Sequence, residues 1–153
     1  MRRRMMKSKI HRATVTGADL HYIGSVSIDP ELLKLADIRE HEQVAILDID
    51  NGARFETYAI VGGPGDVCLN GAAARLVHPG DRIIVITYAD YEDAELDTYE
   101  PTIVHVDTAN RAIDEQTAKQ LARATTPGPV RYTEISAEVD RHMAHLDAEL
   151  EDL

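Results

Sequence analysis

Short apolar segments alternate with turn residues between residues 9 and 107, which indicates a protein built mainly from β-strands. Segments 43–49 and 54–61 are both rich in aliphatic and β-branched residues, and they flank the pair Asn51-Gly52. An Asn-Gly pair in that position predicts a β-hairpin, because both central turn residues need positive φ. Segment 82–88 is almost continuously apolar, which is typical of a buried strand.

Two further strands and two short helices complete this part of the chain. Residues 9–16 contain β-branched residues without a helical period, and residues 102–107 have a similar pattern. Asp29 can cap a short helix, because Pro30 suits the first turn and apolar residues follow it. Residues 71–77 are a candidate for a second short helix. Many short strands with few helices predict a small β-barrel or a β-sandwich.

The sequence after residue 107 follows a different pattern. Residues 108–131 are polar and contain the break Pro127-Gly128-Pro129. Apolar residues then recur at spacings of three and four, at Ile135, Val139, Met143, Leu146, Leu150 and Leu153. This spacing predicts an amphipathic helix, which would be marginal alone and is expected to pack on the barrel or on a second subunit. We therefore expect a β-rich domain, 1–107, followed by a polar linker and an acidic C-terminal helix, 108–153.

Composition and charge exclude several classes of protein. The 153 residues carry a net charge of −11, which argues against nonspecific binding to nucleic acid or to an anionic membrane. No apolar segment is long enough to span a membrane, and none follows the basic N-terminus as a secretory signal would. A single cysteine, Cys68, excludes an internal disulfide and favours a reducing, cytoplasmic location. Charge is also uneven: residues 1–12 hold six basic residues and no acid, and residues 90–100 hold six acids and no base.

The common catalytic motifs are absent. The sequence has no Gly-x-Ser-x-Gly elbow, no phosphate-binding glycine-rich loop and no dinucleotide fingerprint. His142 and His145 lie three residues apart, which fits a solvated helix face better than a metal site, so we expect no metal. Taken alone, Gly24-Ser25 is an ordinary turn, and Cys68 is a small buried apolar residue.

Three separated segments change this interpretation. They are KIHRATVTGADLHYIGSVS at residues 9–27, NGARFETYAI at residues 51–60 and NGAAARLVHPGDRIIVI at residues 70–86. Together they resemble the bacterial aspartate 1-decarboxylases, pyruvoyl-dependent enzymes that make β-alanine for pantothenate and thus for coenzyme A. The resemblance covers about residues 5–107, and several segments in the right order make it specific. It does not extend into the tail, and the loop at residues 62–67 is shorter than that family's by a residue or two.

The resemblance implies a small double-psi β-barrel that assembles as a homotetramer with active sites between subunits. It also implies self-cleavage between Gly24 and Ser25, after which Ser25 becomes the pyruvoyl group that forms the Schiff base with the substrate, L-aspartate. Tyr58 would be the proton donor, and Thr57 would assist both cleavage and substrate binding. The substrate-binding residues implied in this way are Lys9, His11, Tyr22, Arg54, Thr57, Asn70, Gly71, Ala72 and Ala73.

The chemistry of decarboxylation agrees with these residue types. Loss of CO₂ from an α-amino acid leaves electrons on the α-carbon, so an electron sink is required, and the chain has no phosphate cradle for pyridoxal phosphate. A ketone made from Ser25 would supply that sink. We assign Arg54 to the side-chain carboxylate of the substrate, because a guanidinium binds a carboxylate through two hydrogen bonds. The hydroxyl of Tyr58 is of the type that can return a proton to carbon at neutral pH.

One geometric difficulty accompanies this assignment. On a regular strand Arg54, Glu56 and Tyr58 share one face, and Thr57 points to the other. Either the strand twists or bulges at this point, or Thr57 and Tyr58 serve different chains at a subunit interface.

Two other functions remain open from the sequence. One is a non-enzymatic β-barrel that binds a partner through its acidic tail. The other is a decarboxylase of another acidic amino acid such as glutamate, because one additional methylene group gives only modest discrimination.

Overall fold

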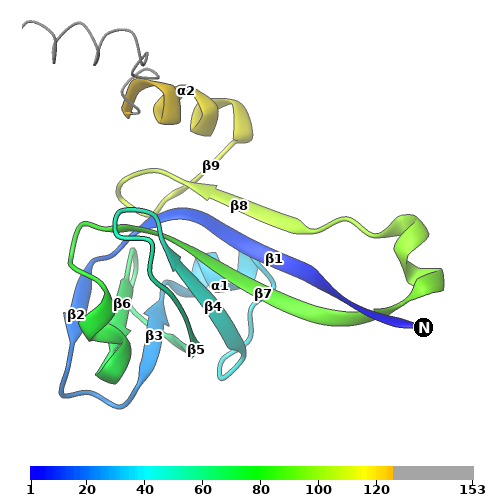
Figure 1. Ribbon diagram of the computed structural model, residues 1–153. Helices are drawn as coiled ribbons and strands as arrows, with labels where there is room; N and C mark the ends of the chain where they lie inside the picture. The colour runs from blue at the N-terminus through cyan, green and yellow to red at the C-terminus, as the bar shows by residue number, and fades with distance from the viewer. Residues whose placement is uncertain (126–153) are drawn as a thin grey trace, which may run out of the picture. The chain divides into compact units, whose positions relative to one another are not determined.

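The computed structural model describes residues 1–125, and their fold is mainly β with short helices. In this part of the chain nine strands form one sheet in the order β2-β6-β3-β5-β4-β7-β1-β8-β9. The strands are β1 (Arg2–Thr14), β2 (Gly17–Asp19), β3 (Ser25–Ile28), β4 (Gln43–Asp48), β5 (Arg54–Val61), β6 (Val67–Asn70), β7 (Arg82–Glu92), β8 (Thr102–Val106) and β9 (Ala112–Ile113). The helices are α1 (Pro30–Leu35), the 3₁₀ helices η1 (Gly71–Leu76) and η2 (Asp93–Thr98), and α2 (Glu115–Thr125). The predicted mainly β fold is confirmed and is consistent with a small β-barrel (Figure 1).

The hairpin and the short helices that local sequence patterns predict form at the expected positions. β4 and β5 pair antiparallel on either side of the Asn51-Gly52 turn, and Gly52 has a φ of 79°. Asp29 caps α1 by accepting a hydrogen bond of 2.7 Å from the backbone N–H of Glu31. The predicted helix after residue 70 is the 3₁₀ helix η1. The helix predicted from Ile135 to Leu153 lies outside the described residues.

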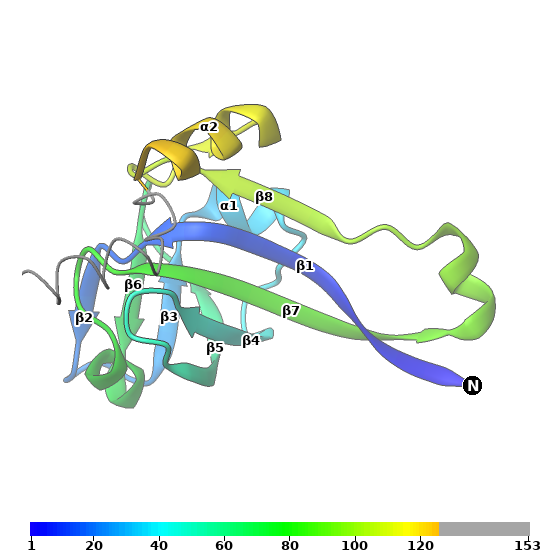
Figure 2. The same ribbon diagram turned by 45° about the horizontal axis from the view of Figure 1, so that its top comes forward.

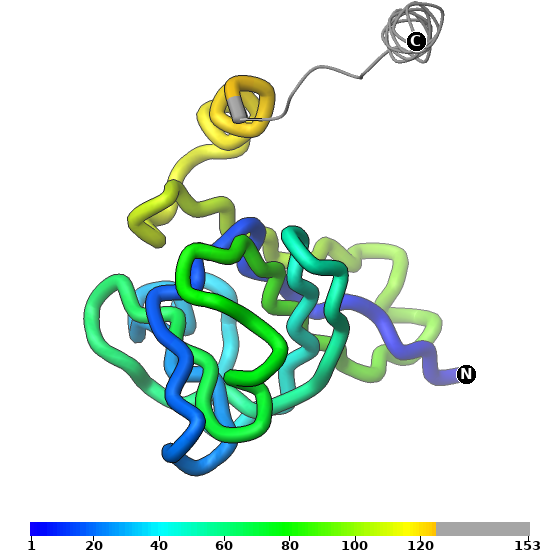
Figure 3. Tube along the Cα trace, turned by 60° about the vertical axis from the view of Figure 1, so that its left-hand side comes forward, coloured from blue at the N-terminus to red at the C-terminus, as the bar shows by residue number. Residues whose placement is uncertain are grey.

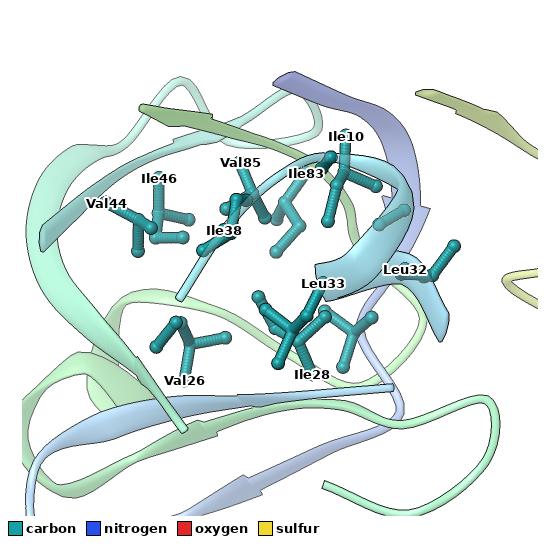
Figure 4. Packing of buried hydrophobic residues seen from close by; sticks show 14 of the residues in the cluster. Ile10, Val26, Ile28, Leu32, Leu33, Ile38, Val44, Ile46, Ile83 and Val85 are labelled. Carbon is teal, nitrogen blue, oxygen red and sulfur yellow. The ribbon is translucent and has the colours of Figure 1, made fainter. Parts of the chain in front are cut away.

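One aliphatic core lies between the strands and α1. Figure 4 shows side chains from β1, β3, α1, β4 and β7 converging on the same interior space. The labelled core residues are Ile10, Val26, Ile28, Leu32, Leu33, Ile38, Val44, Ile46, Ile83 and Val85. Alternate residues of each strand therefore face this core, and the residues between them face outward.

The strand β1 is the longest in the described chain and pairs with a strand on each side. It pairs antiparallel with β7 from Arg2 to Thr14, with two bulges, and parallel with β8 between Ser8 and His11. β1 and β7 run side by side toward the N-terminus in both views (Figures 1 and 2). The basic N-terminus thereby meets the acidic segment: Arg2 pairs with Glu92 at 2.7 Å. The uneven charge of the sequence is therefore partly neutralised along this ribbon.

Residues 1–118 form one compact unit, and residues from 119 onward belong to a second unit. Residues 107–113 still contact the strands: Asn110 is buried, and its side chain bonds the backbone of Thr14 at 2.7 and 2.9 Å and the carbonyl of Gly65 at 3.0 Å. No helix in the described part of the chain is long and apolar enough to cross a membrane.

Candidate active site

The Gly24–Ser25 bond lies where an exposed loop enters the buried start of β3. The loop that precedes it is open to solvent, with Tyr22 and Ile23 exposed by 54% and 77%. Ser25 is only 1% exposed. The candidate cleavage site is therefore reached directly from the surface, although its serine is shielded from bulk water.

The hydroxyl of Ser25 has two neutral hydrogen-bond partners. It donates to the carbonyl oxygen of Ile23 at 3.2 Å and accepts from Nδ2 of Asn70 at 2.9 Å. Among residues 1–125 no carboxylate or imidazole is hydrogen-bonded to it. The amide N–H of Asn70 is placed to stabilise negative charge that develops on this oxygen.

Asn70 occupies this position because β6 pairs antiparallel with β3, with Asn70 opposite Ser25. The same Nδ2 also donates to the hydroxyl of Ser27 at 2.9 Å, and Oδ1 accepts from the Cys68 thiol at 3.5 Å. Asn70 is itself buried. Sequence reasoning found Asn70 only through the resemblance and missed Ser27 and Cys68, although both lie two residues from a candidate residue and so share its face.

Gly71 brings the start of η1 against the candidate bond. A Cβ at Gly71 would lie 2.7 Å from Cα of Gly24 and 2.8 Å from its nitrogen, and the φ of Gly71 is +64°. Figure 3 shows the loop before β3 and the η1 segment at the same end of the strands. Of the predicted backbone contacts, Gly71 is buried, Ala73 is half-buried and Ala72 is exposed.

Tyr58 lies on the same side of the sheet as Ser25. β3 and β5 pair parallel with Val26 opposite Ala59, so the preceding position on each strand brings Tyr58 level with Ser25. The β4–β5 register is regular from Gln43 to Leu47, so no bulge turns Thr57 toward that side. In the described chain the Thr57 side chain forms no hydrogen bond, and Thr57 faces the side opposite Tyr58. This regularity favours the alternative in which Thr57 and Tyr58 serve different chains, which stays a prediction.

The predicted cations form a second group, separate from Ser25. Strand register places Arg54 in one row with His11, and Lys9 in the neighbouring row, on the outer face of the sheet. Arg54 lines a cavity of about 600 Å³ together with Glu56 and Tyr88, and Ser25 does not line it. Arg54 and Tyr58 are four positions apart along β5, which corresponds to about 13 Å between their Cα atoms. Arg54 therefore lies some way along the sheet from the level of Ser25, and the two residues do not line the same cavity.

Lys9 and Arg54 have no acidic group within ion-pair distance anywhere in residues 1–125. Both cations are thus available to an anionic ligand, on a face that carries Glu56 as well as several apolar residues. Ala45, Leu47, Ile84, Ile86 and Ile103 lie in the same rows.

His11 differs from these cations because its surroundings keep it uncharged. Its ring packs edge-on against His105, with centroids 5.5 Å apart, and the Nδ1 atoms of both rings are buried without a hydrogen-bond partner in the described chain. Burial, and then the nearby Lys9, His105 and Arg12, lower the pKa of His11 to about 4. At neutral pH it can offer a hydrogen bond but not a positive charge. Sequence reasoning did not single out His105.

Within residues 1–125 no three His, Cys, Asp or Glu residues gather in a group that could hold a metal ion. The pair His142 and His145 lies outside the described residues.

Comparison with known families agrees with the resemblance seen in the three sequence segments. The family model described as aspartate decarboxylase matches residues 1–113, which include Ser25, Tyr58, Asn70 and the two cations Lys9 and Arg54. Members of that family are carboxy-lyases, so the enzymatic interpretation is confirmed over a non-enzymatic binding module. The chain belongs to the aspartate decarboxylase family.

Proposed function

We propose that this protein converts L-aspartate to β-alanine and CO₂, with a pyruvoyl group that it makes from its own Ser25. The product would serve pantothenate and coenzyme A synthesis. The observation that carries this proposal is the buried Ser25 hydroxyl, held by Asn70 at 2.9 Å and next to a glycine on which Gly71 packs closely. A serine in an ordinary turn would need none of these constraints.

Residues that this sequence supplies can carry out the cleavage. Oγ of Ser25 adds to the carbonyl carbon of Gly24 and the C–N bond breaks. The hydroxyl proton passes to the freed amine nitrogen, and an ester joins the two residues. Loss of the α-proton of Ser25 then releases the Gly24 carboxylate and leaves dehydroalanine, which water converts to pyruvoyl and ammonia. Asn70 donates to Oγ during the attack, and we assign Thr57 to the oxyanion on Gly24, as the family resemblance implies.

The residues around Ser25 fit a pyruvoyl group, which is small and uncharged. The position is buried, and its hydrogen-bond partners are a neutral amide and a backbone carbonyl. When present, the group supplies the ketone that accepts the electrons left after CO₂ departs.

Substrate binding and proton transfer would fall to the outer-face residues. Arg54, which has no acidic partner in the described chain, would bind the side-chain carboxylate of aspartate. The departing carboxylate should not be held by a cation, because a contact that stabilises its charge opposes loss of CO₂. Tyr58, on the side of Ser25, would protonate the α-carbon. Lys9, His11, Tyr22 and the backbone of residues 71–73 would complete the pocket.

The separation of Ser25 from Arg54 supports an assembly in which subunits share their active sites. We propose a homotetramer in which the outer face of one subunit, with Lys9 and Arg54, lies opposite the Ser25 of another. The apolar residues between these cations would be covered in that assembly, which removes them from water.

Intact-mass measurement tests the central step. The wild-type chain should give one fragment of residues 1–24 and one of residues 25–153, the latter lighter by one ammonia than simple hydrolysis would leave it. Ser25→Ala should remain uncut and inactive. An uncut wild-type chain that is still active on aspartate would overturn the mechanism. Parallel assays with L-aspartate and L-glutamate decide the substrate.

A further inference from the structure

Asn70 has a more elaborate set of partners than a single contact with Ser25 requires. Its Nδ2 donates to two hydroxyls, those of Ser25 and Ser27, each at 2.9 Å. Its Oδ1 accepts from the Cys68 thiol at 3.5 Å. The three partners come from the two strands β3 and β6, on the face that holds Ser25.

These partners determine which way the amide points. Because the Ser25 hydroxyl already donates to the carbonyl of Ile23, its oxygen is left to accept, and it needs the NH₂ end of Asn70. Ser27 offers a second acceptor for that end, and Cys68 offers a donor for the oxygen end. A reversed amide would lose its donation to Ser25 and would place two N–H groups against a thiol.

The thiol of Cys68 stays protonated, which allows it to donate to the amide oxygen of Asn70. Burial, and then the negative charges of Asp19 and Asp66, raise the pKa of the Cys68 thiol. It therefore remains protonated at neutral pH and can donate to Oδ1 of Asn70 at 3.5 Å, with the carbonyl of Leu69 as a more distant acceptor at 4.0 Å. A thiolate could only accept, and it would favour the reversed amide.

We propose that Ser27 and Cys68 are positioning residues that hold the amide of Asn70 with its N–H toward Ser25, and that they set the rate of self-cleavage in this way. The inference rests on the proposed self-cleavage and extends it to two residues that never touch the scissile bond.

The rate of cleavage in the full-length chain tests this proposal. Each chain is made by brief cell-free synthesis, and loss of the intact mass is followed over time. Ser27→Ala and Cys68→Ala should each slow cleavage about twofold to tenfold, the worth of one ordinary hydrogen bond. Ser27→Thr and Cys68→Ser, which keep an acceptor and a donor, should restore most of the rate.

A matched control is Ser8→Ala, which removes a buried hydroxyl bonded to Thr87 at 2.8 Å on other strands. It should lower the midpoint of thermal unfolding without slowing cleavage. The double variant Ser27→Ala with Cys68→Ala should be slowed by less than the product of the single effects, because both residues act through one amide.

Several outcomes would overturn the proposal. Cleavage at the wild-type rate in both alanine variants would overturn it. So would a double variant whose cleavage is slowed by the full product of the two single effects. An uncut wild-type chain, identical to Ser25→Ala, would instead refute self-cleavage itself. The two failures are therefore distinguishable in one experiment.

Discussion

The hydroxyl of Tyr58 can be removed with little change to its surroundings. The ring is half-buried and lies 6.2 Å from the ring of His41, a contact that phenylalanine would keep. We therefore expect Tyr58→Phe to fold and to cut itself normally. Decarboxylation should fall by about 10²- to 10⁴-fold, the usual contribution of a positioned general acid. Initial rates of CO₂ release from the cleaved variant measure this.

Self-cleavage of Tyr58→Phe, followed by mass, is the internal control. Turnover close to that of the wild type would remove Tyr58 from the mechanism and leave water or His11 as the proton source.

Substitution of two glycines that both have positive φ can distinguish the effect of backbone strain from the effect of crowding at the candidate site. Gly52 and Gly71 have φ of +79° and +64°, but a Cβ at Gly52 would meet nothing within 4 Å, whereas one at Gly71 would meet Gly24. Gly52→Ala should cost only the strain of a left-handed residue, about 1–2 kcal/mol, and should cut itself at the normal rate. Gly71→Ala should both unfold more easily and fail to cut.

Urea unfolding and intact mass, measured on both glycine variants, check this pair. Normal cleavage in Gly71→Ala would show that the close approach of η1 to Gly24 is unimportant for the reaction.

Individual site residues could be predicted from the sequence only where they stand in a segment that resembles the family. Ser25, Tyr58 and Asn70 stand in recognisable segments, and the structure places them at neighbouring positions of β3, β5 and β6. Ser27 stands in the first of these segments but has no role that the resemblance implies, and its contact with Asn70 exists only because two strands pair in a particular register. Nor could the neutral state of His11 be predicted, since it depends on burial and on neighbours from another strand.

At the scale of elements, the pairing of β1 with β8 buries His11 next to His105 and makes the stability of the fold depend on pH. His11 faces Lys9, Arg12 and His105, and its pKa is about 4 in the folded protein against 6.5 for an unperturbed histidine. As pH falls from about 6.5 to about 4, the unfolded chain takes up a proton that the folded chain does not. Stability should therefore fall in that interval.

The variant His11→Gln should lose part of this dependence. Urea midpoints of variant and wild type, compared at pH 7.5 and pH 5, measure the difference. If the urea midpoint changed equally with pH in the two proteins, the loss of stability at low pH would come from groups other than His11.

Local signals were sufficient for some elements and not for others. The β4–β5 hairpin and the start of α1 were predictable because a turn and a cap are encoded within a few residues. The parallel pairs β1–β8 and β3–β5 join segments far apart in the sequence, and no local pattern specifies them. The extension of β7 as far as Glu92 depends on its pairing with the basic N-terminus.

At the scale of the molecule, the end of the enzymatic unit can be tested by truncation. The sequence predicts that the β-domain ends at residue 107, but Asn110 bonds Thr14 and Gly65 from beyond that point. We expect a chain ending at Ala118 to fold, cut itself and decarboxylate aspartate. A chain ending at Asp107 should be less stable, because the end of β1 at Thr14 and the loop at Gly65 lose Asn110 as their hydrogen-bond partner.

Thermal unfolding and intact mass of the two truncated chains measure this difference. Equal stability would place the boundary at residue 107, as the sequence predicts. Loss of folding in the longer chain would show that residues beyond 118 are needed.

The position of β1 between β7 and β8 has a consequence for the cut protein. Cleavage after Gly24 would leave β1, with its long pairing to β7 and its core residue Ile10, on a peptide of only 24 residues. The mature enzyme would then be a naturally split protein, in which a short peptide completes a sheet that the larger fragment cannot close. Its refolding would need two molecules to meet, so the rate should rise with peptide concentration. The uncut Ser25→Ala chain, in which β1 is still covalently attached, should refold at a rate that does not depend on protein concentration.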